Sequence, residues 1–221
     1  MSNRREFIKK IGIGLSLLLS TNFLSFKKAY GTYKPKVVII GGGFGGASCL
    51  KYLSNFSENI DITMVEKKSK IQTCPFSNLV IGGAMEYSKI VFNPKNFMKQ
   101  NIKFVNEFVN YINPKKKIIN FNNNLFLEYD FLILSPGIGF KWEKIIGYNK
   151  DDIKKIPHCW DGNKNILEFI KKLKDLENNS KIIITAPDYP YRCPPAPYER
   201  ASLIANFMKK EGKKFKIFIL D

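Results

Sequence analysis

The sequence has few of the residues from which metal sites and dithiol redox sites are built. Its 221 residues include one histidine and four cysteines, at positions 49, 74, 159 and 193, with no CxxC pair. This spacing excludes the common zinc sites and a CxxC redox centre, so we expect no metal site. The motif CxxCH is also absent, and the chain therefore cannot attach a c-type haem to itself.

Apolar runs of transmembrane length are absent as well, since a spanning helix needs about 20 apolar residues. The longest uncharged stretch, Ile11 to Phe26, follows a basic segment and leads to a short exit ending at Ala29, which is typical of a signal peptide. The basic segment, residues 3–9, reads NRREFIK and resembles the twin-arginine motif. We expect residues 1–29 to be a twin-arginine signal peptide and the protein to work in the periplasm. A Sec signal peptide and an uncleaved anchor are the alternatives.

Negative charge is scarce relative to positive charge. The chain has 36 Lys and Arg residues against 19 Asp and Glu residues, a net charge of +17. Such a charge is compatible with nucleic acid, an anionic membrane or an acidic protein as partner. The lysines scatter over predicted helices and loops, as at Lys171, Lys172 and Lys174, and an exported protein does not meet nucleic acid. We therefore expect no nucleic-acid partner.

The region after the predicted leader begins with the pattern of a dinucleotide-binding unit. An apolar strand over residues 36–40 precedes a glycine loop, a helix over residues 47–56 and a second strand over residues 60–65. The spacing GxGxxG permits the tight turn and close approach of backbone to a pyrophosphate, and an acidic residue after the second strand can bind ribose hydroxyls. We expect these residues to bind the cofactor: Gly41, Gly43, Gly45, Gly46 and Glu66.

A later strand indicates which dinucleotide is bound. After a probable hairpin over residues 118–121 and 125–129, an apolar run from Asp130 ends in a small-residue turn made of Ser135, Pro136 and Gly137. This looks like the strand and turn that close the first FAD segment in flavoproteins with two dinucleotide-binding domains, although an ordinary turn is the alternative. Lys67 is a candidate contact to the adenosine side or a solvated surface lysine.

A second βαβ pattern follows, with strands over residues 181–185 and 215–220 and a helix over residues 197–210. Its first turn, residues 186–197, is rich in proline and has no glycine, so we do not expect NAD(P)H to be the electron donor. The predicted fold is α/β: an incomplete Rossmann-like FAD-binding domain, residues 34–150, followed by the start of a second Rossmann-like domain, residues 151–221.

Three motifs surround the cysteines: TCPFSN at residues 73–78, PHCW at residues 157–160 and YRCPPAPYERA at residues 191–201. Together with the glycine loop and the predicted leader, they resemble the flavoprotein subunit of flavocytochrome c sulfide dehydrogenase. Sulfide:quinone oxidoreductases share the overall plan. The resemblance implies an FAD-dependent enzyme that oxidises sulfide and passes electrons to a c-type cytochrome subunit.

The resemblance also implies roles for single residues. Cys74 matches the cysteine whose sulfur binds covalently to the 8-methyl carbon of FAD, and a buried free cysteine is the alternative. Cys193 matches one cysteine of a redox disulfide beside the flavin, where the neighbouring Arg192 favours a thiolate. Glu199 matches a glutamate close to the flavin and is a candidate proton acceptor, with a salt bridge to Arg200 or a solvent-facing position as alternatives.

The chain departs from that family in length, because it stops after the second strand of the second unit. No cysteine follows Cys193 to complete the redox disulfide. We expect either a fragment or a chain that works with a second polypeptide supplying the rest. A non-catalytic FAD-binding remnant and a relative of the sulfide:quinone oxidoreductases are the alternatives. Cys159 is expected to be structural, although His158 beside it leaves a nucleophile–base pair open.

Overall fold

The computed structural model describes residues 33–122 and 124–221 of the chain. The predicted signal peptide, residues 1–29, lies outside them. Within the described ranges, no helix has both the length and the apolar character needed to cross a membrane.

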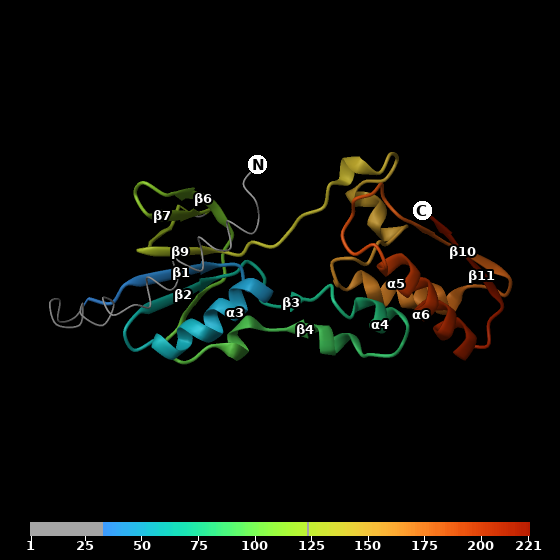
Figure 1. Ribbon diagram of the computed structural model, residues 1–221, viewed down its shortest axis with the longest axis horizontal. Helices are drawn as coiled ribbons and strands as arrows, with labels where there is room; N and C mark the ends of the chain where they lie inside the picture. The colour runs from blue at the N-terminus through green and yellow to red at the C-terminus, as the bar shows by residue number, and fades with distance from the viewer. Residues whose placement is uncertain (1–32, 123) are drawn as a thin grey trace.

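A four-stranded parallel sheet forms the N-terminal part (Figure 1). Its strands are β1 (Lys36–Ile40), β2 (Asp61–Val65), β5 (Lys103–Val105) and β9 (Phe131–Leu134), in the order β5-β2-β1-β9. Central strands of a parallel sheet are covered on both faces, which is why β1 and β2 are runs of buried, mostly β-branched residues. The predicted α/β class and the predicted strands are thereby confirmed.

Different elements cover the two faces of this sheet. Helix α3 (Phe44–Leu53) packs Leu50 against Ile39 and Met64 on one face. The other face is covered by an antiparallel sheet of β6 (Val109–Asn113), β7 (Ile118–Phe121) and β8 (Phe126–Glu128). Helix α3 begins three residues earlier than predicted, because Gly43 is already its N-cap, and it ends in a 3₁₀ turn over Ser54–Phe56.

Between β2 and β5 the chain leaves the sheet and returns. The short antiparallel strands β3 (Ile71–Gln72) and β4 (Val91–Phe92) carry it out and back, and helix α4 (Ser77–Ile81) lies between them. The remaining 3₁₀ turns cover Tyr87–Ile90, Pro94–Phe97, Trp142–Lys144 and Lys150–Lys154.

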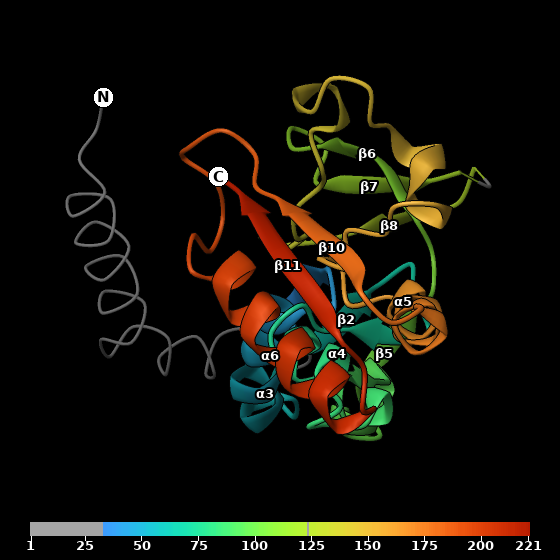
Figure 2. The ribbon, with the colours of Figure 1, turned by 90° about the vertical axis from the view of Figure 1, so that its right-hand side faces the viewer.

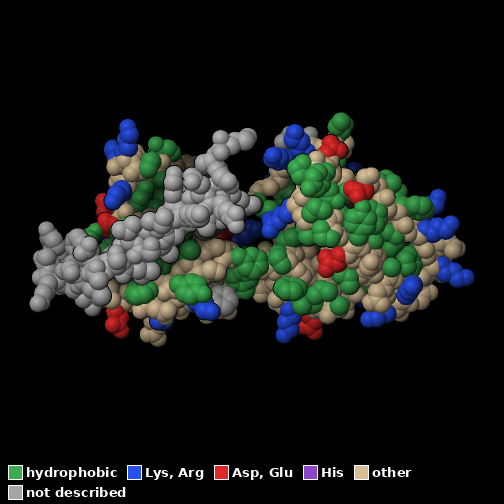
Figure 3. Space-filling model, in the orientation of Figure 1, with side chains coloured by type: hydrophobic (Ala, Val, Ile, Leu, Met, Phe, Trp, Pro, Cys, Tyr) green, Lys and Arg blue, Asp and Glu red, His purple; other side chains and the backbone are tan. Residues whose placement is uncertain are grey.

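The C-terminal part consists of α5 (Asn165–Asp175), β10 (Ser180–Thr185), α6 (Ala196–Lys210) and β11 (Phe215–Leu220). Strands β10 and β11 pair in parallel, and Figure 2 shows them side by side with α6 beneath. This confirms the predicted second βαβ unit, including both bounds of β11. On the face seen in Figure 3, apolar side chains gather over this part and lysines and arginines lie mostly at its rim.

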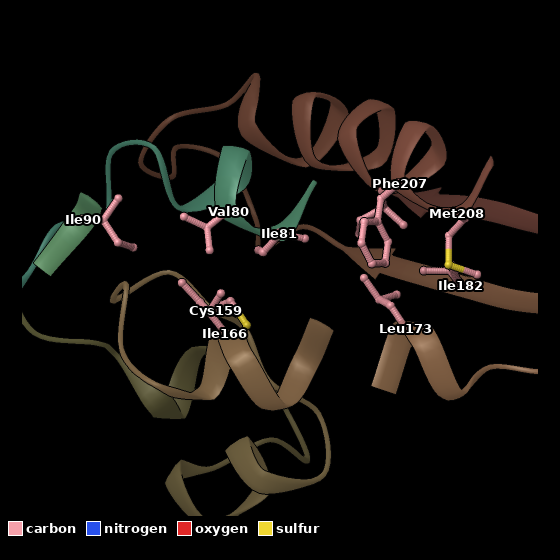
Figure 4. Packing of buried hydrophobic residues seen from close by; sticks show 10 residues of the cluster. Val80, Ile81, Ile90, Cys159, Ile166, Leu173, Ile182, Phe207 and Met208 are labelled. Carbon is pink, nitrogen blue, oxygen red and sulfur yellow. The ribbon is translucent and has the colours of Figure 1, made fainter. Parts of the chain in front are cut away.

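One apolar core joins α4 to this C-terminal part. In Figure 4, side chains of α4, α5, α6 and β10 point toward one another. The fully buried members include Ile81 of α4, Ile166 of α5 and Ile204 of α6. The excursion after β2 is therefore fixed by burial against helices that lie more than 80 residues later in the chain.

Replacement of Ile166 by Ala tests the role of this core. Ile166 is fully buried, so we expect the variant to lose about 2–5 kcal/mol of unfolding free energy, measured by urea titration. The neighbouring Leu167 is 47% exposed, and Leu167→Ala should change the same quantity by no more than about 0.5 kcal/mol. Equal losses in the two variants would contradict the packing of α5.

Candidate functional site

The glycine loop lies at the carboxyl edge of the parallel sheet, between β1 and α3. Gly41 has a φ of +98°, and its N–H donates to the carbonyl of Val65 at 2.8 Å. A Cβ on Gly41 would lie 2.0 Å from the carbonyl oxygen of Ser135, and a Cβ on Gly46 would lie 1.7 Å from that of Gly41. Only glycine fits at these two positions.

Gly43 differs from the other glycines of the loop, since no heavy atom lies within 4 Å of the place its Cβ would take. The same is true of Gly137 in the turn after β9. Ser135 connects the two segments, because its N–H donates to Ile40 at 2.8 Å and its Oγ lies 3.1 Å from the Cβ position of Gly45. The loop and the turn thus lie together and leave open space beside the backbone.

Glu66 closes this edge of the sheet. One carboxylate oxygen accepts from the N–H of Gly42 and the other from the N–H of Lys68, both at 2.8 Å. An ionised carboxylate has further lone pairs, so these bonds leave capacity for ribose hydroxyls. Lys67 is exposed and its Nζ lies 5.3 Å from the ring centroid of Phe108, a cation–π contact at the surface.

The two cysteines singled out by the sequence begin equivalent turns. The carbonyl of Cys74 accepts from the N–H of Ser77 at 3.0 Å as α4 begins. In the same way, the carbonyl of Cys193 accepts from the N–H of Ala196 at 3.0 Å as α6 begins. Cys74 is half-buried and Cys193 is exposed.

Helices α4 and α6 pack side by side and run in the same direction. A Cβ on Gly82 would lie 2.8 Å from the Cβ of Leu203, and a Cβ on Gly83 would lie 3.0 Å from the ring of Phe207. At the start of α4, Asn78 donates to Glu199 at 2.7 Å. Residues later in α4 contact residues later in α6, so the two helices are parallel and both N-termini lie at one end of the pair. The structure therefore brings the turns of the two cysteines together.

The buried side chain of Arg200, on α6, binds this end of α4. It is only 7% exposed, and its Nε donates to the Oδ1 of Asn78 at 2.9 Å while its Nη1 donates to the carbonyl of His158 at 2.5 Å. Its guanidinium also lies 4.8 Å from the ring centroid of Trp160. The Nη2 atom is buried without a hydrogen-bond partner among the described residues. A positive charge with spare donor capacity is thus held between α4 and α6.

The charges around Cys74 oppose the effect of burial. Burial raises the pKa of the Cys74 thiol, while the guanidiniums of Arg192 and Arg200 act to lower that pKa. Negative charge at Cys193 acts in the same direction as burial and raises the pKa of Cys74 further. Burial lowers the pKa of Arg200, and negative charge at Cys159, Cys74 or Glu199 opposes that shift.

Cys159 belongs to the core rather than to a reactive pair. Burial raises the pKa of its thiol to about 12, and it packs with the apolar residues between α4 and α5. The Nδ1 of His158 accepts from the N–H of Trp160 at 3.0 Å, and burial lowers the pKa of the imidazole. Both groups are therefore neutral near pH 7, which favours the structural role over a nucleophile–base pair.

Asn78 is the residue whose part in the site the sequence did not reveal. A salt bridge from Glu199 to Arg200 was one expectation, but Asn78 stands between them, donating to the carboxylate and accepting from the guanidinium. The only signal in the sequence was its place in the motif TCPFSN.

One surface pocket lies away from these residues. Its volume is about 440 Å³, and Lys36, Asp61 and Lys103, the first residues of β1, β2 and β5, line it. The pocket is thus at the amino edge of the sheet, opposite the glycine loop. Among the described residues, no group of three or more His, Cys, Asp and Glu side chains could hold a metal ion.

Two family models match the chain. The model described as pyridine nucleotide-disulphide oxidoreductase matches residues 35–179. The model described as the central part of the sulfide dehydrogenase [flavocytochrome c] flavoprotein chain matches residues 167–221.

Individual relatives agree with both models. A sulfide dehydrogenase [flavocytochrome c] flavoprotein chain of Chlorobaculum thiosulfatiphilum is 56% identical over 45 residues, which cover 20% of this chain and 94% of that sequence. The mitochondrial sulfide:quinone oxidoreductase of Dictyostelium discoideum is 28% identical over 187 residues, 82% of this chain and 40% of the relative. The sulfide:quinone oxidoreductase structure from Aquifex aeolicus superposes with a TM-score of 0.65 at 24% identity, covering 83% of this chain and 42% of that one. The chain thus spans about two fifths of the sulfide:quinone oxidoreductases it matches.

Two glycines of the loop provide a matched pair for testing its packing. Gly46→Ala places a methyl group against backbone at 1.7 Å, so we expect a loss of about 1–3 kcal/mol or more in unfolding free energy. Gly43→Ala meets no atom within 4 Å and has a φ of −71°, so stability should change by no more than about 1 kcal/mol. Chemical denaturation measures both, and a Gly46→Ala variant as stable as the parent would contradict the close approach.

Arg200→Met tests the buried cation. The variant leaves the Oδ1 of Asn78 and the carbonyl of His158 without their donor, so we expect a loss of about 1–3 kcal/mol of unfolding free energy. Arg192→Met removes an exposed guanidinium and should change it by no more than about 0.5 kcal/mol. Thermal and urea unfolding should agree, and similar losses in both variants would refute the anchoring role of Arg200.

Proposed function

This chain belongs to the pyridine nucleotide-disulphide oxidoreductase family and, within it, to the group of sulfide dehydrogenase [flavocytochrome c] flavoprotein chains; on that premise we propose that it binds FAD and serves in sulfide oxidation. The observation that carries the proposal is the meeting of the Cys74 and Cys193 turns at one end of the α4–α6 pair, beside a buried guanidinium. The chain spans about two fifths of its sulfide:quinone relatives, so the activity of the whole protein is part of this proposal.

The residues at the carboxyl edge of the sheet fit a dinucleotide. The open space at Gly43 allows a pyrophosphate to approach the backbone, and the N-terminus of α3 supplies N–H groups and a favourable dipole. Glu66 would bind ribose hydroxyls, and Gly137 leaves room beside the turn after β9. When bound, FAD would accept two electrons from sulfur chemistry and release them one at a time.

Cys74 would hold the cofactor covalently. A bond from its sulfur to the flavin requires a thiolate, and Arg192 and Arg200 supply the positive charge that favours this form against the effect of burial. The hydrogen bond of Cys74 to Ser77 acts in the same direction. The half-buried position excludes part of the solvent from the sulfur.

Cys193 would be one sulfur of a redox disulfide whose second cysteine comes from the remainder of the assembly. Hydrosulfide attack on that disulfide breaks the S–S bond, leaves one cysteine as a persulfide and releases the other as a thiolate that carries the electron pair. Glu199 would accept the proton of the hydrosulfide, with its carboxylate oriented by Asn78.

The electron acceptor in this proposal is a c-type cytochrome subunit, and the site of action is the periplasm, reached through the leader at residues 1–29. The domain division at residue 150 belongs to the same proposal. Sulfide:quinone reduction is the second candidate, favoured by the relatives that match more than four fifths of the chain. Sulfide-dependent reduction of a c-type cytochrome or of a soluble quinone, assayed with the completed assembly, distinguishes the two.

In-gel flavin fluorescence after denaturing electrophoresis tests the cofactor assignment. We expect a fluorescent band for the full chain purified from a periplasmic extract, because a thioether survives denaturation. Cys74→Ala should abolish the band, whereas Cys49→Ala, which changes a partly buried thiol on α3, should keep it.

A soluble, exported chain without fluorescence would contradict covalent attachment. Fluorescence that persists in Cys74→Ala would move the attachment to another residue.

A further inference from the structure

All four cysteines of the chain are free thiols, and two of them lie in equivalent turns. Cys74 and Cys193 each stand three residues before a helix, are each followed by proline, and each accept a hydrogen bond from the N–H three residues later. In the proposed function, Cys74 and Cys193 do not react with each other.

The packing of α4 against α6 sets the relation of the two turns. Asn78 donates to Glu199 and, at 3.5 Å, to the carbonyl of Ala196, so the first turns of both helices are bound together. Two further contacts hold the turn of Cys74 in place. The N–H of Thr73 donates to the carbonyl of Ile90, and Gly162 packs against the carbonyl of Thr73. The turn of Cys193 is exposed and so is accessible to small thiol reagents.

The charges at this place favour thiol–disulfide chemistry. Thiolates, not thiols, attack disulfides, and Arg192 and Arg200 both stabilise negative charge at the Cys74 sulfur. Arg192 directly precedes Cys193 in the chain. The other two cysteines are less suited, since Cys159 is buried with a pKa of about 12 and Cys49 packs on α3 against the first sheet.

We propose that, in the chain without flavin, Cys74 and Cys193 form a disulfide with each other. The thiolate of Cys193 attacks a small disulfide such as oxidised glutathione, forms a mixed disulfide and releases one glutathione thiolate. The thiolate of Cys74 then attacks the Cys193 sulfur and releases the second glutathione. The two cysteines lose two electrons and two protons, and the small disulfide is reduced to two thiols. Bond formation requires Cα atoms within about 7 Å, so the proposal requires the exposed turn of Cys193 to reach this distance from the turn of Cys74.

The consequence for cofactor loading rests on the proposed function. A sulfur held in the Cys74–Cys193 disulfide cannot bond to flavin, so reduction of this disulfide must precede covalent attachment. The same disulfide protects Cys193 from over-oxidation in an oxidising compartment. Once FAD is bound, Cys74 would be attached to the flavin and Cys193 would be free to form the redox disulfide of the proposed function.

Peptide mapping of the flavin-free full chain tests the disulfide. After incubation with oxidised glutathione, alkylation of the remaining thiols and digestion with trypsin, we expect peptide 71–89 linked to peptide 193–200. Alkylation of Cys193 should fall at least tenfold relative to the reduced chain. A subsequent excess of reduced glutathione should restore it.

Two variants separate a specific pair from accidental oxidation. In Cys74→Ser, Cys193 should keep one glutathione, because no second thiol displaces it. In Cys49→Ser, the matched control, the link between peptides 71–89 and 193–200 should form as in the parent. The proposal would be overturned if the glutathione adduct on Cys193 persisted in the parent as long as it does in Cys74→Ser. A link from peptide 193–200 to peptide 156–164, which contains Cys159, would also overturn it.

The outcome is independent of the flavin assay. A chain that forms the link but never carries flavin supports the disulfide and contradicts covalent attachment. If the loaded protein carries flavin on Cys74 but the flavin-free protein never forms the link, the proposed function is supported and the disulfide is overturned.

Discussion

The placement of the Cys74 and Cys193 turns depends on the buried guanidinium of Arg200. It joins three segments that are remote in sequence: α6, which carries it, α4 through Asn78, and the His158–Trp160 segment through a carbonyl and an aromatic ring. A buried cation is costly unless it is well paired, so these partners cannot separate without exposing an unsatisfied charge. The end of the α4–α6 pair is thereby held in one arrangement. The Cys74 and Cys193 turns both begin at that end.

Apolar packing also holds α4 against its neighbouring helices. Helix α4 has only five residues and would not be stable alone, but it is buried between α5 and α6. Gly82 and Gly83 allow α6 to approach the end of α4, where a Cβ on either would meet Leu203 or Phe207. The first βαβ unit and the C-terminal part are therefore connected by a shared core as well as by the chain between β9 and α5.

The strands and the glycine loop were predictable from the sequence because their causes are local. Runs such as VVII and FKIFIL are bounded by glycine or polar residues, and the loop requires glycine at Gly41 and Gly46. Strands β3 and β4 have two residues each and α4 has five, too short for any periodicity to show. The bond between Arg200 and Asn78 spans 122 positions, so no spacing pattern could reveal it. The motifs marked the two cysteines as candidates, and only the fold shows that their turns lie at the same end of the α4–α6 pair.

The most direct test of this account is the distance between the sulfurs of Cys74 and Cys193. Spin labels on these two cysteines, in a Cys49→Ser background, should broaden each other's continuous-wave EPR spectra, while labels on Cys49 and Cys193 in a Cys74→Ser background should not. Broadening limited to the first pair would place both cysteines in one site. Unbroadened spectra from the Cys74–Cys193 pair would separate the two turns and contradict the shared site.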